Sequence, residues 1–367
     1  MTKRITLKTI AQHAGVSVGT VSNVLNGKPN VSSELREAVL SAARELGYPY
    51  AGRAIENSSL VTVFGLSIKN QYTTATQSVS REVRKTAESK GIQLIEYDNE
   101  NDVEQQILQI DEMIDRKMEA ILFTPVKHDA FAETVSRCKR QNIPIISLTR
   151  RLTGVEATAT FSADNYHAGR DLALYITTKL GQRPGKILEI RTEAGDLNGT
   201  ERHAGFVDGI AHWPWISIVD SANMVWSKHE AWGGAYEITR RALKKHKDIN
   251  VIFCHVDEAF EAVIRALADC GRLYPCDSPD HVMLVGVDGS PTALEYIRQG
   301  YADCVSEQPI IEMAVMAVEA AIEAMKYPFK PLSSRFLPTQ LVTAHNIDCA
   351  EHWGKLFVEE AAVAAHA

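Results

Sequence analysis

A regular alternation of strand-like and helix-like segments between Leu60 and Val287 constrains the fold more than any other feature of this sequence. Short apolar runs, typical of buried strands, occur at 60–66, 92–97, 120–123, 144–148, 186–190, 216–219, 251–254 and 282–287. Segments with helical periodicity lie between them, at 76–90, 103–116, 130–141, 166–180, 200–211, 228–245 and 258–270. Alternation at this spacing predicts βαβ units and parallel sheets.

The alternation restarts near residue 160, which predicts two similar doubly wound halves. In such folds a ligand binds between the carboxyl ends of the strands. A length of 367 residues suits two or three domains, and 45% hydrophobic with 23% charged residues excludes a largely disordered chain.

The first 58 residues differ from the rest in pattern and in charge. They carry seven basic and four acidic residues, a net charge of +3, whereas the whole chain has a net charge of −7. A basic head on an acidic body is typical of a small DNA-binding domain attached to a larger domain that does not bind DNA.

Two short helices joined by a tight turn are predicted between Thr9 and Gly27. Apolar residues recur at helical spacing on both sides of Gly15, which can adopt a positive φ and end the first helix. Ser17 can cap the second helix. The pattern alone fits an ordinary helical hairpin as well as a helix-turn-helix unit, whose second helix enters the major groove.

The local sequence from Thr6 to Tyr48 resembles the headpiece of the LacI/GalR family of bacterial transcription regulators. The residues that carry the resemblance are 7–11, 14–17, 20–22, 24–27, 31–32, 36 and 46–48. Leu35 departs from it, since the family usually has Thr there, and one phosphate contact is expected to be lost. The resemblance implies DNA contacts from Thr6, Lys8, Ser17, Val18, Gly19, Thr20, Ser22, Asn23, Asn26 and Ser32.

The segment 48–59 is the linker that follows the headpiece. In the family this segment folds as a hinge helix on DNA and inserts a leucine into the minor groove. Here Pro49 is shifted and Gly52 weakens a helix, so Ile55 is the nearest wedge and Arg53 the adjacent phosphate contact. The alternative that this segment is only a flexible linker has equal support from the sequence.

The body from Leu60 to Pro338 resembles type I periplasmic sugar-binding proteins, most closely their ribose-binding branch. The motifs that carry this resemblance are 161–169, 202–206, 285–289 and 308–309. We expect a headpiece and hinge at 1–58, a ligand-binding region at 59–350 and a tail at 351–367. The N-terminal half would comprise about 60–161 and 307–335, and the C-terminal half about 162–306 and 336–350.

Polar and aromatic side chains follow several of the predicted strands, where sugars are held by hydrogen bonds and ring faces. Each alone fits a surface loop or a structural ion pair. The positions that match sugar contacts of the ribose-binding branch are Asn70, Tyr72, Arg150, Arg202, Trp226 and Asp288. Val256, Thr149 and Glu307 replace the family's usual Asn, Asp and Gln, which implies a ligand other than ribose.

The sequence holds no enzyme motif that we recognise. It has no phosphate-binding P-loop, no G-x-S-x-G elbow and no H-E-x-x-H zinc helix, so no catalytic residue, metal or cofactor is expected. The six cysteines are scattered and are expected to be reduced. Without a signal peptide or a long apolar segment, we expect a cytoplasmic protein that does not contact a membrane.

These observations together predict a ligand-responsive transcription regulator, a repressor that binds operator DNA as a homodimer and takes a sugar, polyol or sugar derivative as effector. Two-fold symmetry would match a pseudo-palindromic operator. An activator of the same fold, or a structural DNA-binding protein that takes no ligand, is the first alternative. A solute-binding transport protein is the second, and an enzyme the third.

Overall fold

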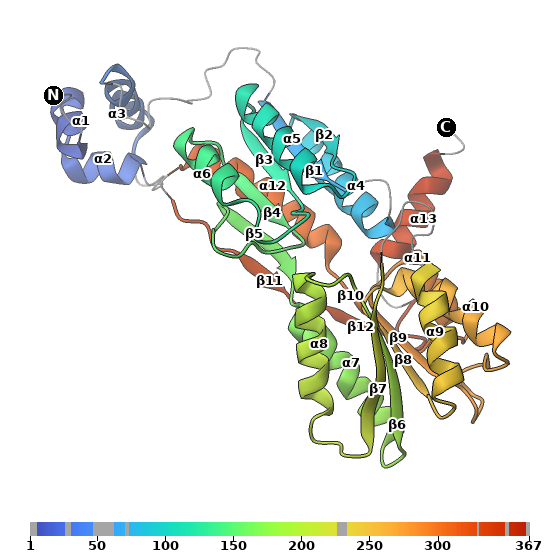
Figure 1. The fold of residues 1–367 in the computed structure, drawn as a ribbon. Helices are drawn as coiled ribbons and strands as arrows, with labels where there is room; N and C mark the ends of the chain where they lie inside the picture. The colour runs from blue at the N-terminus through green and yellow to red at the C-terminus, as the bar shows by residue number, and fades with distance from the viewer. Residues whose placement is uncertain are drawn as a thin grey trace.

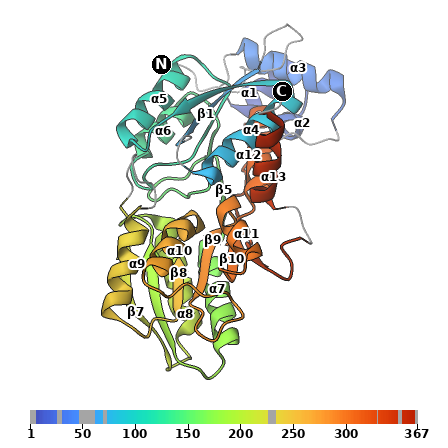
Figure 2. The ribbon, with the colours of Figure 1, turned by 90° about the vertical axis from the view of Figure 1, so that its right-hand side faces the viewer.

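The computed structural model describes residues 6–25, 31–46, 62–69, 73–225, 233–328, 330–348 and 352–364. It contains a small helical headpiece and two α/β halves, each built on one six-stranded sheet (Figures 1 and 2). The predicted fold class is therefore confirmed. Among the described helices, none is both long and apolar enough to cross a membrane.

The headpiece consists of α1 (Leu7–Ala14), α2 (Val18–Leu25) and α3 (Ser33–Glu45). Their apolar faces form one small core that includes Ile10, Val21 and Val39. Gly15 ends α1 with a φ of 68°, and the Ser17 hydroxyl accepts the Thr20 N–H at 3.0 Å. The turn and the cap predicted from the sequence are thus both present.

The sheet of the first half has the strand order β11-β5-β4-β3-β1-β2, and all its strands are parallel. The bounds are β1 (Thr62–Ile68), β2 (Ile92–Asp98), β3 (Ala120–Phe123), β4 (Ile145–Leu148), β5 (Ala159–Ala163) and β11 (Arg335–Leu337). Helices α4 (Thr74–Ser89) and α12 (Ile310–Lys326) pack on one face, and α5 (Val103–Asp115) and α6 (Ala132–Arg140) pack on the other.

The sheet of the second half has the order β12-β10-β9-β8-β6-β7, with only β12 antiparallel to its neighbour. Its strands are β6 (Gly185–Arg191), β7 (Ile216–Asn223), β8 (Val251–Cys254), β9 (Met283–Asp288), β10 (Cys304–Glu307) and β12 (Gln340–Thr343). Helices α7 (Asn165–Leu180) and α8 (Leu197–Ile210) cover one face. The other face carries α9 (Gly233–Lys245), η1 (Asp257–Ala259), α10 (Phe260–Asp269) and α11 (Pro291–Arg298).

The chain passes between the halves three times, after β5, after β10 and after β11. The strands β5, β10, β11 and β12 were not predicted, and neither were α11 and α12. The strands among them are only three to five residues long, and β5 and β10 include serine or threonine at buried positions. Short strands of this composition lack the apolar run by which buried strands are recognised in a sequence.

The C-terminal helix α13 (Trp353–Ala364) packs against α4 of the first half and α11 of the second (Figure 2). Trp353 is buried among the apolar residues that α4 and α12 place on the first sheet. Its indole N–H donates to the carbonyl of Asp288 in the second half at 2.8 Å. The C-terminal segment therefore packs against the first half and is hydrogen-bonded to the second.

Candidate functional site

A cavity of about 580 Å³ lies between the two halves. Many of its wall residues lie at the end of a strand or follow it within two positions, as expected where the carboxyl ends of parallel strands face each other. Asp196, Asn198 and Arg202 come instead from the start and first turns of α8. From the first half come Lys69, Thr124, Thr149 and Arg150, and from the second Thr192, Asp196, Asn198, Arg202, Met224, Val256, Asp288 and Gln308.

The polar floor of the cavity is organised around Arg202, a buried side chain of α8. Its Nη2 lies 3.2 Å from Oδ1 of Asp288, and its Nε donates to Oδ1 of Asn165 at 2.8 Å. A third bond runs from Nη1 to the carbonyl of His255. Gln308 donates to the same carboxylate oxygen of Asp288. The guanidinium and the carboxylate are thus fixed by the protein itself.

Three non-glycine residues that line the cavity have a positive φ. The angle is 130° at Asp288, 59° at Thr149 and 62° at Asn101, and such values cost energy for most residues other than glycine. The strained turn at Asp288 is held by Asp257, whose carboxylate accepts the N–H groups of Gly289 at 2.6 Å and Ser290 at 3.1 Å. Burial, followed by the Asp288 carboxylate, raises the pKa of Asp257 well above its ordinary value.

Polar contacts join the two halves around the cavity. Asn198 donates to the carbonyl of Thr149 at 3.1 Å, and Arg150 lies 3.6 Å from the Asp196 carboxylate. Farther out, the Glu258 carboxylate accepts the N–H of Thr74, at the N-terminus of α4, at 2.6 Å. The structure therefore shows an arrangement in which the halves touch on several sides of the cavity.

Charges that line the cavity balance. The basic side chains are Lys69, Lys127, Arg150 and Arg202, and the acidic ones are Asp129, Glu193, Asp196 and Asp288. Burial and then Arg150 lower the pKa of Lys69 to about 8. Burial opposes ionisation of Asp196, but Arg150 and Arg202 lower its pKa. The cavity therefore has charged groups of both signs in its lining without a strong excess of either charge.

The structure brings together four of the eight residues selected from the sequence, namely Arg150, Arg202, Val256 and Asp288, all of which line the cavity. Asn70, Tyr72 and Trp226 lie outside the described residues. Glu307 does not line the cavity. Its carboxylate instead lies 2.7 Å from Nδ1 of the buried His352 and accepts the N–H of Trp353 at 3.1 Å.

Sequence reasoning missed several residues of the cavity wall. The amide Gln308 lines it, one position after Glu307, because β10 ends at Glu307 and the next residue turns into the cleft. Asp196 is the N-cap of α8, and Asn198 is the second residue of this helix. The position directly after a strand was a usable signal for Gln308 and for Lys69, whereas the place of Asp196 and Asn198 depends on where α8 begins.

The headpiece presents the start of α2 to solvent. Ser17, Val18 and Gly19 are exposed, and Thr20, Ser22 and Asn23 are half-buried. Thr6, Lys8 and Ser32 are exposed beside the starts of α1 and α3. The N–H groups at helix starts suit phosphate contacts. The remaining predicted DNA contacts, Asn26, Arg53 and Ile55, lie outside the described residues.

Comparison with known proteins finds two family matches. Residues 6–49 match the bacterial regulatory proteins of the lacI family, and residues 64–328 match the periplasmic binding protein domain. The ribose operon repressor of Halalkalibacterium halodurans is 26% identical over 347 residues, which cover 92% of this chain and 95% of that protein. The ribose import binding protein of Escherichia coli is 25% identical over 243 residues, 66% of this chain and 78% of that protein.

Solved structures share the fold of the body. The Caulobacter myo-inositol binding protein has a TM-score of 0.72 at 21% identity, covering 82% of this chain and 100% of that one. The binding protein of the arabinose transporter from Shewanella has a TM-score of 0.74 at 21% identity, covering 83% and 99%. The family matches show that the chain has a DNA-binding domain of the lacI family of bacterial regulatory proteins at its N-terminus and that its body belongs to the periplasmic binding protein domain family.

Proposed function

We propose that this protein is a transcription repressor whose affinity for operator DNA is controlled by a small sugar-like effector in the cleft. The observation that carries the proposal is the pairing of a helix-turn-helix headpiece with a cavity whose polar groups come from both halves. A ligand that contacts both halves favours the arrangement in which they touch, and it can thereby change the geometry of the attached headpieces.

The balance of charge in the cavity supports a neutral effector with several hydroxyl groups. Arg202, Asp288, Asn198 and Gln308 offer both donors and acceptors, as hydroxyl groups require. A sugar phosphate would bring two negative charges next to Asp196 and Asp288. The similarity to a ribose operon repressor and a ribose import binding protein supports the same class of ligand.

We propose ligand contacts from Arg150, Arg202, Val256 and Asp288, joined by Asn198 and Gln308. Asn70, Tyr72 and Trp226 remain proposed contacts on the evidence of the sequence. Glu307 is a poor candidate, since His352 and Trp353 already occupy its carboxylate. For the DNA, we propose that Val18 and Asn23 read bases while the helix starts and Arg53 meet phosphates, with Ile55 as the wedge.

Repression by a homodimer in the cytoplasm completes the proposal. Two headpieces related by two-fold symmetry would read two half-sites about one helical turn apart. The resemblance of the body to import binding proteins favours solute transport as the second candidate. A transport protein has no need of sequence-specific DNA binding, so DNA selection separates the two functions.

The experiment has two arms on the full chain. Selection from random duplexes should enrich one pseudo-palindromic sequence, and thermal-shift screening should find a neutral sugar or polyol that raises the melting temperature. That compound should then lower the affinity for the selected duplex in fluorescence anisotropy. If the selection enriched no duplex sequence, the proposal that this protein is a transcription regulator would be contradicted. An effector found only among sugar phosphates would contradict the ligand class alone.

A further inference from the structure

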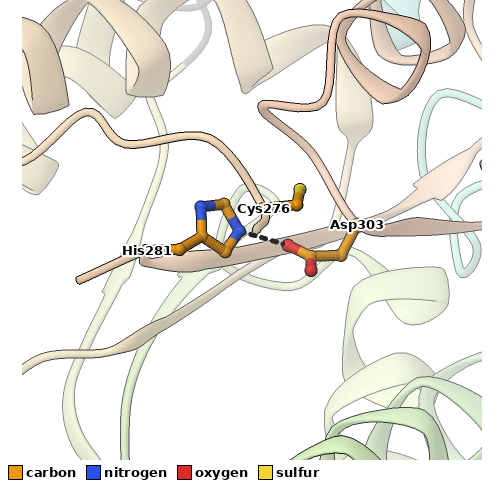
Figure 3. Close-up of side chains that lie close together, drawn as sticks. All are labelled: Cys276, His281 and Asp303. Carbon is orange, nitrogen blue, oxygen red and sulfur yellow. Dashed lines mark hydrogen bonds and ion pairs between the residues drawn. The ribbon is translucent and has the colours of Figure 1, made fainter. Parts of the chain in front are cut away.

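Three side chains with metal-binding atoms lie together at the far end of the second half. They are Cys276, His281 and Asp303 (Figure 3). Their ligand atoms all lie within 4.8 Å of one another, and Nε2 of His281 is 2.8 Å from Oδ2 of Asp303. Cys276 is exposed, while His281 and Asp303 are mostly buried, so the cluster is open to solvent on the thiol side.

The imidazole and the carboxylate of this cluster are held in place by the backbone. Nδ1 of His281 lies 2.7 Å from the carbonyl of Tyr274, so Nδ1 carries the proton and Nε2 is turned toward Asp303. Asp303 accepts the N–H of Leu284 at 2.8 Å. Histidines that bind metals usually donate their second ring N–H to a carbonyl or carboxylate, which fixes the ring for the metal. His281 already has this arrangement.

We propose that Cys276, His281 and Asp303 bind one Zn²⁺ ion, with water as the fourth ligand. Sulfur, imidazole nitrogen and carboxylate oxygen are the donors that tetrahedral zinc takes in proteins, at bond lengths that separate the ligand atoms by roughly 3.3–3.6 Å. The 2.8 Å between Nε2 of His281 and Oδ2 of Asp303 must therefore widen by about 0.5 Å, while the exposed Cys276 side chain moves its sulfur into bonding distance of the ion. Binding replaces the thiol proton and the proton between Nε2 and Asp303, and both protons pass to solvent.

The proposed zinc site lies at the opposite end of the sheet from the ligand cavity. His281 precedes β9, whereas Asp288 at the other end of this strand lines the cavity. A strand of six residues separates the two ends by about 20 Å. A bound zinc ion would connect the loop between α10 and β9 with Asp303, the residue that directly precedes β10. The proposal therefore stands apart from the sugar cleft and does not rest on the proposed function.

Sequence spacing gave no sign of this site. The three residues are separated by 5 and 22 positions, which matches no common zinc motif. They meet because β9 and β10 are neighbouring parallel strands, so the residues that precede the two strands lie side by side. Only the sheet topology brings His281 and Asp303 together.

Cobalt titration of the full chain tests the site, because Co²⁺ replaces zinc and reports its ligands in the absorption spectrum. With a non-chelating reductant present, one Co²⁺ per chain should give the intense visible bands of a tetrahedral ion and a thiolate charge-transfer band. Zn²⁺ should abolish both and should raise the melting temperature.

Cys276→Ser should remove the charge-transfer band and weaken Zn²⁺ binding by more than about 100-fold, and His281→Gln should weaken it similarly. Cys270→Ser is the matched control, because Cys270 is also exposed and lies outside the cluster. This variant should retain wild-type spectra. Weak six-coordinate cobalt bands, or a charge-transfer band that persists in Cys276→Ser, would overturn the proposal.

Discussion

Nη2 of Arg202 lies 3.2 Å from Oδ1 of Asp288, and both side chains are almost completely buried. Burying two charges is costly, and it is tolerated here because each has further hydrogen-bond partners. The pair is fixed between α8 and the end of β9, and both residues line the cavity. Pre-organisation of this kind reduces the entropy that a ligand loses on binding.

We expect Asp288→Asn to shift the effector response to much higher effector concentrations while leaving operator affinity unchanged. The amide keeps the size of the side chain but removes the charge that Arg202 and the ligand share. Loss of a charge-assisted hydrogen bond costs about 1.5–3 kcal/mol, which corresponds to a 10- to 150-fold weaker effector. Effector titration of the operator complex, followed by fluorescence anisotropy, measures both quantities.

Glu295→Gln is the control for this variant, because Glu295 is an exposed residue of the adjacent α11. It should respond to effector like the wild type. A wild-type response from Asp288→Asn would mean that the effector binds elsewhere.

Glu258→Ala should weaken effector binding although Glu258 does not line the cavity. Its carboxylate accepts the N–H and the hydroxyl of Thr74, so it joins the halves only when they touch. Without that contact the touching arrangement is less favourable, and the dissociation constant of the effector should rise about tenfold. Isothermal titration calorimetry measures it. Glu261→Ala, on an exposed position of α10, should leave the constant unchanged. Equal effector dissociation constants for the two variants would show that the contact between Glu258 and Thr74 does not stabilise the arrangement in which the halves touch.

Asn23→Ala should weaken binding to the selected operator by about 1–3 kcal/mol and weaken binding to random duplex much less. Asn23 lies on α2 near its exposed face, where an amide can pair with adenine. Anisotropy titrations on both duplexes at one salt concentration give the comparison. Equal losses on the two would show that Asn23 contacts only the DNA backbone.

Acid should destabilise the second half through Glu189, a buried residue of β6. Burial favours its neutral form, but hydrogen bonds from His255 and His203 outweigh this and lower its pKa to about 2. A carboxyl whose pKa falls on folding stabilises the protein above its unfolded pKa, and this contribution is lost as the pH falls toward 2. Between about pH 5 and pH 3 the loss should be about 2 kcal/mol.

Urea denaturation at several pH values measures this dependence. Glu189→Gln should be less stable at neutral pH and should lose less stability between these pH values than the wild type. Glu133→Gln, at an exposed position of α6, should match the wild type at each pH. An unchanged slope in Glu189→Gln would assign the acid sensitivity to other groups.

The sequence was sufficient to predict both sheets and the headpiece because their main strands and helices are amphipathic or uniformly apolar over several residues. It failed at β5, β10, β11 and β12, whose pairing depends on partners more than 10 residues away. The turn at Gly15 and the cap at Ser17 were predictable because both are local.

Some residues of the candidate cavity could likewise be predicted from the local sequence, and others could not. Arg150 and Asp288 could be selected from the sequence because each lies at or just after the carboxyl end of an apolar strand, whereas Arg202, inside α8, was selected through the resemblance to sugar-binding proteins. Glu307 was assigned one position too early, since the sequence does not define where β10 ends. The partners of its carboxylate, His352 and Trp353, lie 45 and 46 residues away, and only tertiary packing reveals them.

The three crossings between the halves limit how such a protein can be taken apart. A fragment that ends with β5 lacks α12, which covers one face of the first sheet, and β11, which pairs with β5. The second half likewise needs β12 from near the C-terminus. Neither half is a continuous piece of chain, so exchanging one half between relatives by a single recombination would break both cores. New effector specificity in this architecture is therefore more accessible through substitutions in the cleft than through the shuffling of halves.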